Sequence, residues 1–488
     1  MNKKITLSIF AIACMTNLNA LEFKPVGYKA IGMGGAGVAS TRGSLSGYYN
    51  PALLRFSDYT SEVSLNVGVN IRESGIVNHI DTLNNIEFEN TLDKVATDAS
   101  SSGGTDLTTS KNIKTAQSTL SQIGASNALG ASVTPSLSAQ ISDSFAIGIY
   151  GNANVGARLN IDANRLDIIV KNNNQYFKYD TNANTYSKTN QTDYENNSLE
   201  YAVDNGLTYL DVNAMALTEI PVSLANSYEL NNGTVSFGIN AKAMGLVTST
   251  QKVKLGKSSE DIDDDLSTYE TEYKPTIGLD LGIAYMLKES SLTLGLVGKN
   301  INNPKFKVDG TSPTGQGDYT IDAMYRAGFS LPLFEDTVEF AFDVDLTKNE
   351  TLIADEDSQM IGGGVEFHPS SWFAFRVGAM QDIASEKFDD GTILTTGLGF
   401  GLKWAQIDLS AMMSTKNGEY EGDSIPRYTA INLAIVSRWG DGYNKKEVPE
   451  KNPYEHVKQR ETLTPAEQKR LQLQSEKAQH ELNMELKK

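Results

Sequence analysis

The residue types that enzyme and metal chemistry require are scarce in this chain and poorly spaced. His79, His368, His456 and His480 are the only histidines; none lies in a predicted strand, and none forms the HExxH pattern of a zinc site. No GxSxG pattern presents a nucleophilic serine. Cys14, the only cysteine, lies in the expected export signal, which leaves no thiol for disulfide or redox chemistry. The sequence predicts no catalytic residue, no metal site and no cofactor, and therefore no enzyme.

An acidic run is the one pattern that resembles a cation site. Asp261, Asp263, Asp264 and Asp265 have the DxDxD spacing of a calcium loop. A calcium loop of that kind places a glycine in the following position, which this run lacks. The run falls in a predicted loop, so a solvated group of charges is the favoured interpretation over a metal site.

A glycine-rich stretch, residues 32–37, matches the GxGxxG pattern of dinucleotide-binding proteins. No buried strand precedes it and no convincing helix follows, so nucleotide binding is disfavoured. The alternative is a plug packed inside a barrel, in which glycine lets the backbone approach the wall and an Asn-Pro pair fixes a turn. The predicted plug covers residues 21–58, with Gly32, Gly34, Gly35, Gly37, Asn50 and Pro51 as its key positions.

The first twenty residues have the layout of a secretory signal. Two lysines precede an apolar run over residues 5–15, and cleavage is expected after Ala20. Residues 11–14 also fit a lipobox, but the apolar stretch before Cys14 is short for a signal core. No later run approaches the roughly 18–20 apolar residues of a membrane helix. If the chain spans a membrane, it must do so as a closed barrel.

The net charge of −18, from 60 acidic and 42 basic residues, argues against nucleic acid as a partner. Strands are indicated instead by apolar and polar residues that alternate with a period of two. The clearest case is residues 338–346, and the pattern recurs along much of the chain. Further examples are residues 277–287, 321–331, 361–367, 373–379, 394–402 and 407–413.

Short and long connections alternate between these strands. Short links lie near residues 142–143, 231–233, 288–290, 334–336, 368–370 and 404–405. Long polar links cover residues 72–132, 157–206, 255–272, 301–318, 348–358, 383–391 and 416–425. Short turns on one side and long loops on the other are typical of an outer-membrane barrel. A soluble secreted β-protein would explain the strand period but not the alternation of loop lengths.

We therefore predict an all-β fold, an antiparallel transmembrane β-barrel of about fourteen strands over residues 59–439, with both termini in the periplasm. Its polar strand faces would line the lumen, with Arg326 facing Asp343 and Glu366 facing Arg376. These charges would fill and stiffen the interior, and substrate contact is the alternative. The predicted lumen-facing residues are Asp322, Arg326, Glu339, Asp343, Asp345, Glu366 and Arg376.

Two segments outside the strands have helical patterns. Residues 72–132 have apolar positions at helical spacing on either side of a Ser/Gly stretch, which predicts two short amphipathic helices. Residues 440–488 form a charged tail in which Thr464 and Pro465 begin a predicted helix. The apolar positions of that helix form no clean stripe, so a solvated periplasmic tail is favoured over a coiled coil.

The order of several short motifs resembles the FadL-related outer-membrane superfamily. The motifs are residues 32–39, 49–52, 295–300, 363–367 and 375–378. Within the superfamily, the closest likeness is to the conjugal-transfer TraF-like barrels and to the PorV group. These barrels are distinct from the thioredoxin-like protein that is also called TraF. The resemblance implies a fourteen-stranded barrel with an N-terminal plug. FadL takes up fatty acids through a lateral opening beside a kinked strand. Here Pro221, in the strand over residues 212–228, would mark such an opening, although this strand is the fourth.

The resemblance implies an outer-membrane protein, surrounded by lipid, that acts as a passive channel for hydrophobic or amphipathic small molecules. The charged tail and the lack of an obvious hydrophobic ligand motif depart from FadL. The alternative is an assembly or docking barrel for conjugation or secretion, without transport activity. Such a barrel would bind envelope proteins through its outer loops and tail.

Overall fold

The computed structural model describes residues 21–440, apart from 101–102, 125–126, 256–273, 313–314, 354–355, 371, 386–387, 389, 403 and 421–422, together with Lys469 and Leu473. The chain divides into two compact units, Met1–Tyr443 and Asn444–Lys488. The predicted signal, the acidic run at 261–265 and nearly all of the predicted tail helix lie outside the described residues. Lys469 and Leu473 are both helical and exposed.

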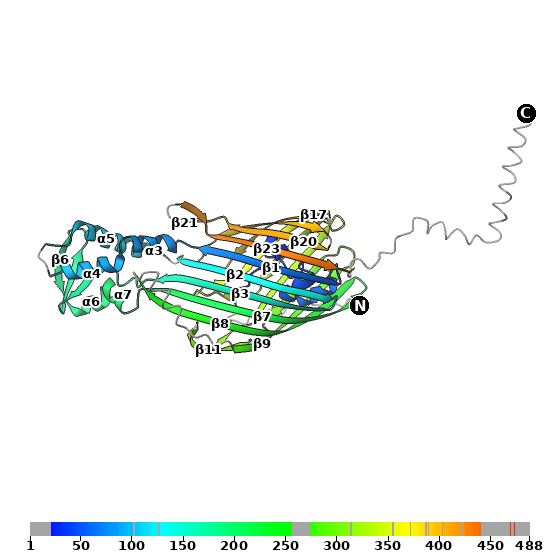
Figure 1. The fold of residues 1–488 in the computed structure, drawn as a ribbon, viewed down its shortest axis with the longest axis horizontal. Helices are drawn as coiled ribbons and strands as arrows, with labels where there is room; N and C mark the ends of the chain where they lie inside the picture. The colour runs from blue at the N-terminus through cyan, green and yellow to red at the C-terminus, as the bar shows by residue number, and fades with distance from the viewer. Residues whose placement is uncertain are drawn as a thin grey trace, which may run out of the picture. The chain divides into compact units, whose positions relative to one another are not determined.

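Fourteen antiparallel strands close into a single barrel (Figure 1), which confirms the predicted strand number. The last strand pairs with the first, from Ser61↔Trp439 to Arg72↔Tyr428. In barrel order the strands are β1 (Ser61–Glu73), β2 (Ala128–Ser142), β3 (Phe145–Asn160), β7 (Tyr209–Leu230), β8 (Gly233–Lys254), β9 (Lys274–Leu287), β10 (Thr293–Lys299), β13 (Met324–Leu333), β14 (Val338–Asp345), β17 (Met360–Ser370), β18 (Phe373–Asp382), β19 (Thr392–Leu402), β20 (Ala405–Ser414) and β23 (Tyr428–Trp439).

The outer wall of the barrel is apolar. In β1, buried and exposed residues alternate, and the exposed set includes Val63, Leu65, Val67 and Val69. Large apolar side chains are likewise exposed on the other thirteen strands. A closed sheet that satisfies its backbone hydrogen bonds and turns such residues outward is built to face hydrocarbon.

The three tryptophans mark one rim of this wall. Trp372 and Trp404 lie in the β17–β18 and β19–β20 turns, and Trp439 ends β23. All three are at least half exposed. Tryptophan is enriched where a membrane meets water, so these residues indicate where the apolar wall ends.

In the part of the chain that the structure describes, no helix is both long and apolar enough to cross a bilayer. Short turns join the strands at the tryptophan rim, and the connections at the opposite rim are long. The predicted alternation of short and long links is confirmed. Three long links form small hairpins: β11 (Lys305–Ser312) with β12 (Gly315–Thr320), β15 (Asn349–Glu350) with β16 (Asp357–Ser358), and β21 (Asn417–Tyr420) with β22 (Asp423–Pro426).

Two other long links, residues 74–127 and 161–208, pack together into what we call the loop domain (Figure 1). The first holds α3 (Ile76–Asn85), α4 (Phe88–Asp98) and α5 (Leu107–Gln122). The second holds a sheet of β4 (Ile169–Asn172), β5 (Gln175–Asp180) and β6 (Thr185–Thr189), then α6 (Gln191–Asn197) and α7 (Leu199–Asp204). Ile113 and Leu120 of α5 share a buried core with Val170 and Phe177 of the sheet.

The loop domain corrects one prediction and adds to another. Two helices were predicted before β2, but there are three. Glu87 adopts a left-handed backbone conformation (φ 45°), which divides the first predicted helix into α3 and α4. Residues 161–208 are strongly polar and show no clear strand pattern, so their sheet was not predicted.

Residues 21–58 form the N-terminal segment, which lies inside the barrel (Figure 1). It contains four short turns of helix: α1 (Tyr28–Gly32), η1 (Gly43–Leu45), α2 (Ser46–Tyr49) and η2 (Pro51–Phe56). At the seam where the barrel closes, Glu62 of β1 accepts hydrogen bonds from Ser44 N at 2.9 Å and from Arg438 Nε of β23 at 2.8 Å. Arg438 also donates to the Tyr28 hydroxyl of α1, so the segment is bound to both strands of the seam.

The barrel lumen as the candidate functional site

One buried ionic group joins the wall to the backbone of the N-terminal segment. Asp343 Oδ2 accepts hydrogen bonds from Gly37 N at 2.7 Å and from Val38 N at 2.9 Å. Arg326 Nε lies 3.4 Å from the same oxygen, and Arg326 Nη1 lies 3.5 Å from Asp345 Oδ1. All three charged residues are about 1% exposed. The structure thus brings together Arg326, Asp343 and Asp345.

A second ionic group lies around Arg376 of β18. Arg376 Nη1 is 2.6 Å from Asp408 Oδ1, and Arg376 Nε pairs with Glu366. Lys29 of the N-terminal segment lies 2.6 Å from Glu339 Oε2 and 3.5 Å from Glu366 Oε1. Asp408 was not among the predicted residues, although its place between Ile407 and Leu409 follows the inward alternation. Lys29 had no such signal, because it lies in α1, outside the alternating strands.

A third group contains residues that the sequence analysis did not single out. Lys242 Nζ lies 2.6 Å from Glu219 Oε1 and 2.9 Å from Asp280 Oδ1, and donates to Asn300 Oδ1 at 2.8 Å. Asn240 Nδ2 donates to Gly47 O of the N-terminal segment at 2.7 Å. Every amine hydrogen of Lys242 therefore has an acceptor.

Asp322 is not on a strand, contrary to the prediction. The alternating pattern starts at Ile321, but β13 begins at Met324. Just before it, Ile321 N donates to Pro304 O at 3.0 Å, and Ala323 N donates to Asn303 Oδ1 at 2.9 Å. These bonds hold Asp322 in the link before the strand.

Two glycines of the N-terminal segment, Gly32 and Gly34, lie where its backbone passes close to the wall. A Cβ on Gly34 (φ +67°) would lie 2.3 Å from Ala379 O, and one on the facing Gly364 would lie 2.7 Å from Met33 Cα. A Cβ on Gly32 would lie 2.9 Å from Arg376 Cβ of the wall, and one on Gly37 would lie 2.3 Å from the Tyr49 ring within the segment. Gly35 O accepts a hydrogen bond from Arg326 Nη2 at 3.2 Å. No larger residue fits at Gly34 without moving backbone.

Asn50 fixes the turn into η2. Its Oδ1 accepts from Ala52 N at 3.1 Å, and its Nδ2 donates to Val38 O at 3.1 Å and to Ile283 O of β9 at 3.2 Å. Pro51 occupies the first position of the helix, where it loses no hydrogen bond. This short motif thus links two parts of the segment to the wall.

Strand β3 is incompletely paired on both of its edges. Pairing with β2 runs to Val133↔Ala153 and resumes at Ser136↔Tyr150 in the same register, which leaves Pro135 opposite Gly151 without a ladder pair. Pairing with β7 likewise omits the positions of Gly148 and Pro221. The β7–β8 ladder continues through Pro221↔Lys242. Pro221 therefore interrupts one neighbour only, because a proline lacks a single donor.

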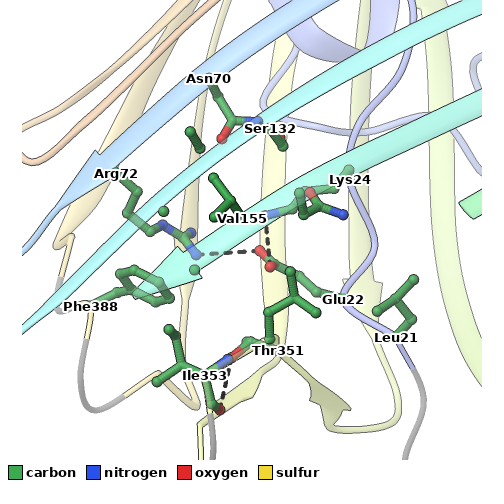
Figure 2. A pocket seen from close by; sticks show the side chains of 15 residues that line it. Leu21, Glu22, Lys24, Asn70, Arg72, Ser132, Val155, Thr351, Ile353 and Phe388 are labelled. Atoms are coloured by element: carbon green, nitrogen blue, oxygen red, sulfur yellow. Dashed lines mark hydrogen bonds and ion pairs between the residues drawn. The ribbon is translucent and has the colours of Figure 1, made fainter. Parts of the chain in front are cut away.

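Two cavities of about 40 Å³ each lie in the lumen. Figure 2 shows the first, where Arg72 Nη1 lies 3.4 Å from Glu22 Oε1. Outside this lining, Arg72 Nε also lies 2.7 Å from Asp390 Oδ2. The second cavity is lined by the N-terminal segment, β3, β7, β10, the residue after β10, and the start of β13. Its lining residues are Leu21, Glu22, Phe23, Tyr48, Tyr150, Gly151, Asn152, Leu217, Glu219, Lys299, Asn300 and Met324. An apolar cavity that binds benzene measures about 150 Å³, so these two have room for water molecules only.

A closed fourteen-strand sheet, an apolar outer wall and a lumen filled by the chain's own N-terminal segment define a transmembrane β-barrel protein. Residues 47–346 match the family model described as "F plasmid transfer operon, TraF, protein". Since the match covers more than half of the chain, the protein belongs to this TraF family. The expected TraF-like resemblance is thereby confirmed.

Solved structures with a similar barrel have low sequence identity to this chain. The CymD monoaromatic hydrocarbon channel is 14% identical, with a TM-score of 0.47, covering 87% of this chain and 100% of its own. The Ralstonia pickettii toluene transporter TbuX is 14% identical, with a TM-score of 0.41, covering 87% and 99%. A Pseudomonas aeruginosa FadL homologue is 10% identical, with a TM-score of 0.43, covering 86% and 100%. No curated protein matches the chain.

Proposed function

We propose that this protein is an outer-membrane channel that passes hydrophobic or amphipathic small molecules between its lumen and the membrane, through the wall at β3. The observation that carries the proposal is the missing pairing on both edges of β3, at Pro135 and Pro221. The same stretch of β3, Tyr150 to Asn152, lines the second cavity.

The physical reason is the cost of parting strands in hydrocarbon. In hydrocarbon, each backbone N–H or C=O group without a hydrogen-bond partner costs roughly several kcal/mol. Where the ladder is already interrupted, side-on passage breaks the fewest hydrogen bonds. Gly151 and Pro135 also place little side-chain bulk at this point, so the wall is thin where it is weakly paired.

A reversible staple across β2 and β3 tests this route. Pro135→Cys with Gly151→Cys places two thiols opposite each other, in a register where facing Cβ atoms are about 4.5–5.5 Å apart. The predicted mature chain has no other cysteine. Leu137→Cys with Ile149→Cys is the matched control, on the same strands but within the continuous ladder.

Uptake of radiolabelled toluene and oleate would be measured in cells whose outer membrane lacks other channels for them. We expect oxidation of the Pro135/Gly151 variant to reduce uptake to that of cells without the protein, and a reductant to restore it. The control staple should leave uptake unchanged. Parental uptake through the fully oxidised Pro135/Gly151 variant would contradict the route.

A docking role in conjugation or secretion is the second candidate, and the loop domain favours it. Two connections that share a buried core form a folded module, whereas loops that only join strands need no core. Replacing residues 75–126 and 162–207 by short turns should abolish mating or secretion and preserve uptake if the domain docks a partner. Lost uptake with unchanged mating and secretion would contradict a docking role.

The orientation of the chain is part of the proposal, with both termini in the periplasm and the loop domain outside. Asp263→Cys and Lys469→Cys would be probed separately on intact cells with a thiol reagent that does not cross membranes. We expect labelling at position 263 only. Equal labelling of both sites would refute the orientation.

A further inference from the structure

Lys242 of β8 meets the side-chain amide of Asn300 inside the barrel, beside two carboxylates. Lys242 Nζ lies 2.8 Å from Asn300 Oδ1. It also lies 2.6 Å from Glu219 Oε1 and 2.9 Å from Asp280 Oδ1. All four residues are buried, and none is more than 9% exposed. An amine, an amide and a carboxylate that touch one another away from bulk water are the groups needed to exchange one amide bond for another.

The backbone holds Asn300 in place for this contact. Asn300 follows the last residue of β10 and has a left-handed backbone conformation (φ 55°), which asparagine adopts more readily than most residues. Its N–H donates to Asp280 Oδ1 at 2.9 Å, and its carbonyl accepts from Asn303 N at 2.9 Å. Asn300 is therefore fixed by bonds that do not involve its side-chain amide, which is left facing Lys242.

Gly278 of β9 leaves room for the two groups to meet. It pairs with Lys242 in the β8–β9 ladder. A Cβ on Gly278 would lie 3.0 Å from Lys242 Cε and 3.4 Å from Asn300 Oδ1. Any side chain at this position would crowd both the amine and the amide, and glycine avoids this.

We propose that Lys242 and Asn300 become covalently joined by an amide bond between Lys242 Nζ and Asn300 Cγ, with Glu219 transferring the protons. The bond ties β8 to the link that follows β10, across β9. It is a modification that the chain makes to itself, and it does not depend on the channel function proposed above.

The reaction balances without a co-reactant. Lys242 passes a proton to Glu219, and the free electron pair of Nζ attacks Asn300 Cγ. As the bond from Cγ to Nδ2 breaks, the leaving nitrogen takes one proton from Nζ and one from Glu219, and departs as ammonium. One lysine ammonium and one primary amide thus become one secondary amide and one ammonium ion, with no oxidant and no water consumed. Nζ already touches the oxygen bonded to Cγ, so a small rotation of the amide brings the reacting atoms into line.

The two carboxylates have different roles. Asp280 accepts from Asn240 Nδ2 at 2.9 Å as well as from the backbone of Asn300, so it positions the amide. Glu219 is left to exchange protons with Lys242. Glu219 and Asn300 also line the second cavity. With a volume of about 40 Å³, this cavity holds a molecule of the size of water, so it also receives the ammonium that leaves.

Mass spectrometry of the purified and denatured full chain tests the bond directly. We expect the parent to be lighter than its sequence by the mass of one ammonia, and proteolysis to release a branched peptide that contains both Lys242 and Asn300. Lys242→Arg and Asn300→Ala should each restore the mass of the sequence. Glu219→Gln should leave most chains unlinked after folding. Glu366→Gln is the matched control, because Glu366 is a similarly buried acid that pairs with Arg376, and it should leave the link intact.

The peptides of the parent decide the outcome even if a variant fails to fold. Recovery of Lys242 and Asn300 in separate, unmodified peptides would overturn the proposal and leave the group as an ordinary network of ion pairs. A loss of ammonia with those two peptides still separate would mean that an asparagine elsewhere had cyclised, and would overturn it too. A branched peptide that persists at the parental level in Glu219→Gln would contradict the role of Glu219.

Discussion

The contact between Asp343 and the N-terminal segment provides a direct test of what holds that segment in the lumen. Asp343→Ala removes the acceptor of two buried backbone hydrogen bonds, from Gly37 N and Val38 N. It also removes the nearer carboxylate partner of Arg326 Nε, at 3.4 Å. Arg326 keeps Asp345 at 3.5 Å, so its charge is not left wholly unpaired.

The size of the effect follows from the two orphaned donors. Leaving a buried N–H without an acceptor costs about 1–3 kcal/mol, so two of them weaken docking of the segment by about 2–6 kcal/mol. Local opening of the segment should become about 30- to 20 000-fold more frequent. Asp343→Asn keeps an acceptor oxygen and should have a smaller effect.

Thiol labelling reports this opening. Ser40→Cys places a single thiol in a buried part of the segment, and its labelling rate in the folded barrel measures how often the segment leaves the lumen. We expect Asp343→Ala to accelerate labelling at Ser40→Cys within the range above. Asp357→Ala is the control, because among the described residues its carboxylate is paired only with Lys348, at 3.9 Å, and both side chains are exposed. An increase of less than about threefold would refute the reasoning.

Three further predictions concern other parts of the chain. Burial raises the pKa of Glu200 to about 7, above its value of 4.5 in the unfolded chain, so the loop domain should lose stability as pH rises from about 4.5 to 7; hydrogen exchange should detect this loss, and Glu200→Gln should remove it. Gly364→Val should accelerate labelling of the Ser40→Cys thiol, because its side chain would overlap the N-terminal backbone, whereas Gly103→Ala, with nothing within 4 Å, should not. Ile113→Ala should destabilise the loop domain by about 2–5 kcal/mol and expose it to protease, whereas Leu107→Ala, at an 84% exposed site, should have no effect.

The parts of the fold that follow from strand alternation were predictable from the sequence. A pleated strand turns successive side chains to opposite faces, so Arg326, Asp343 and Glu366 had to share a side if their strands crossed a bilayer. The same rule failed at Asp322, because the alternating pattern begins at Ile321, three residues before the first residue of β13. Hydrogen bonds from the neighbouring link decide that boundary, and they leave no trace in local sequence.

The remaining site depends on contacts between distant segments. Lys29 and Lys299 have ordinary sequence surroundings. Only the path of the N-terminal segment places Lys29 between Glu339 and Glu366. The same path places the rings of Phe23 and Tyr48 against Lys299. Pro221 did indicate a weakened ladder, but the companion interruption at Pro135 became visible only from the register of β2 and β3. The sheet of the loop domain was missed because its short, polar strands are stabilised by α5, which precedes them by about fifty residues.

The hydrogen bonds of Glu62 constrain the order in which this protein can assemble. Its carboxylate joins Ser44 of the N-terminal segment to Arg438 of the last strand, at the line where the two ends of the sheet meet. A sheet that closed while empty would bury this acid and arginine with one partner missing, and would afterwards have to reopen to admit the segment. We therefore expect the N-terminal segment to be in place before β23 pairs with β1, so that the barrel closes around it.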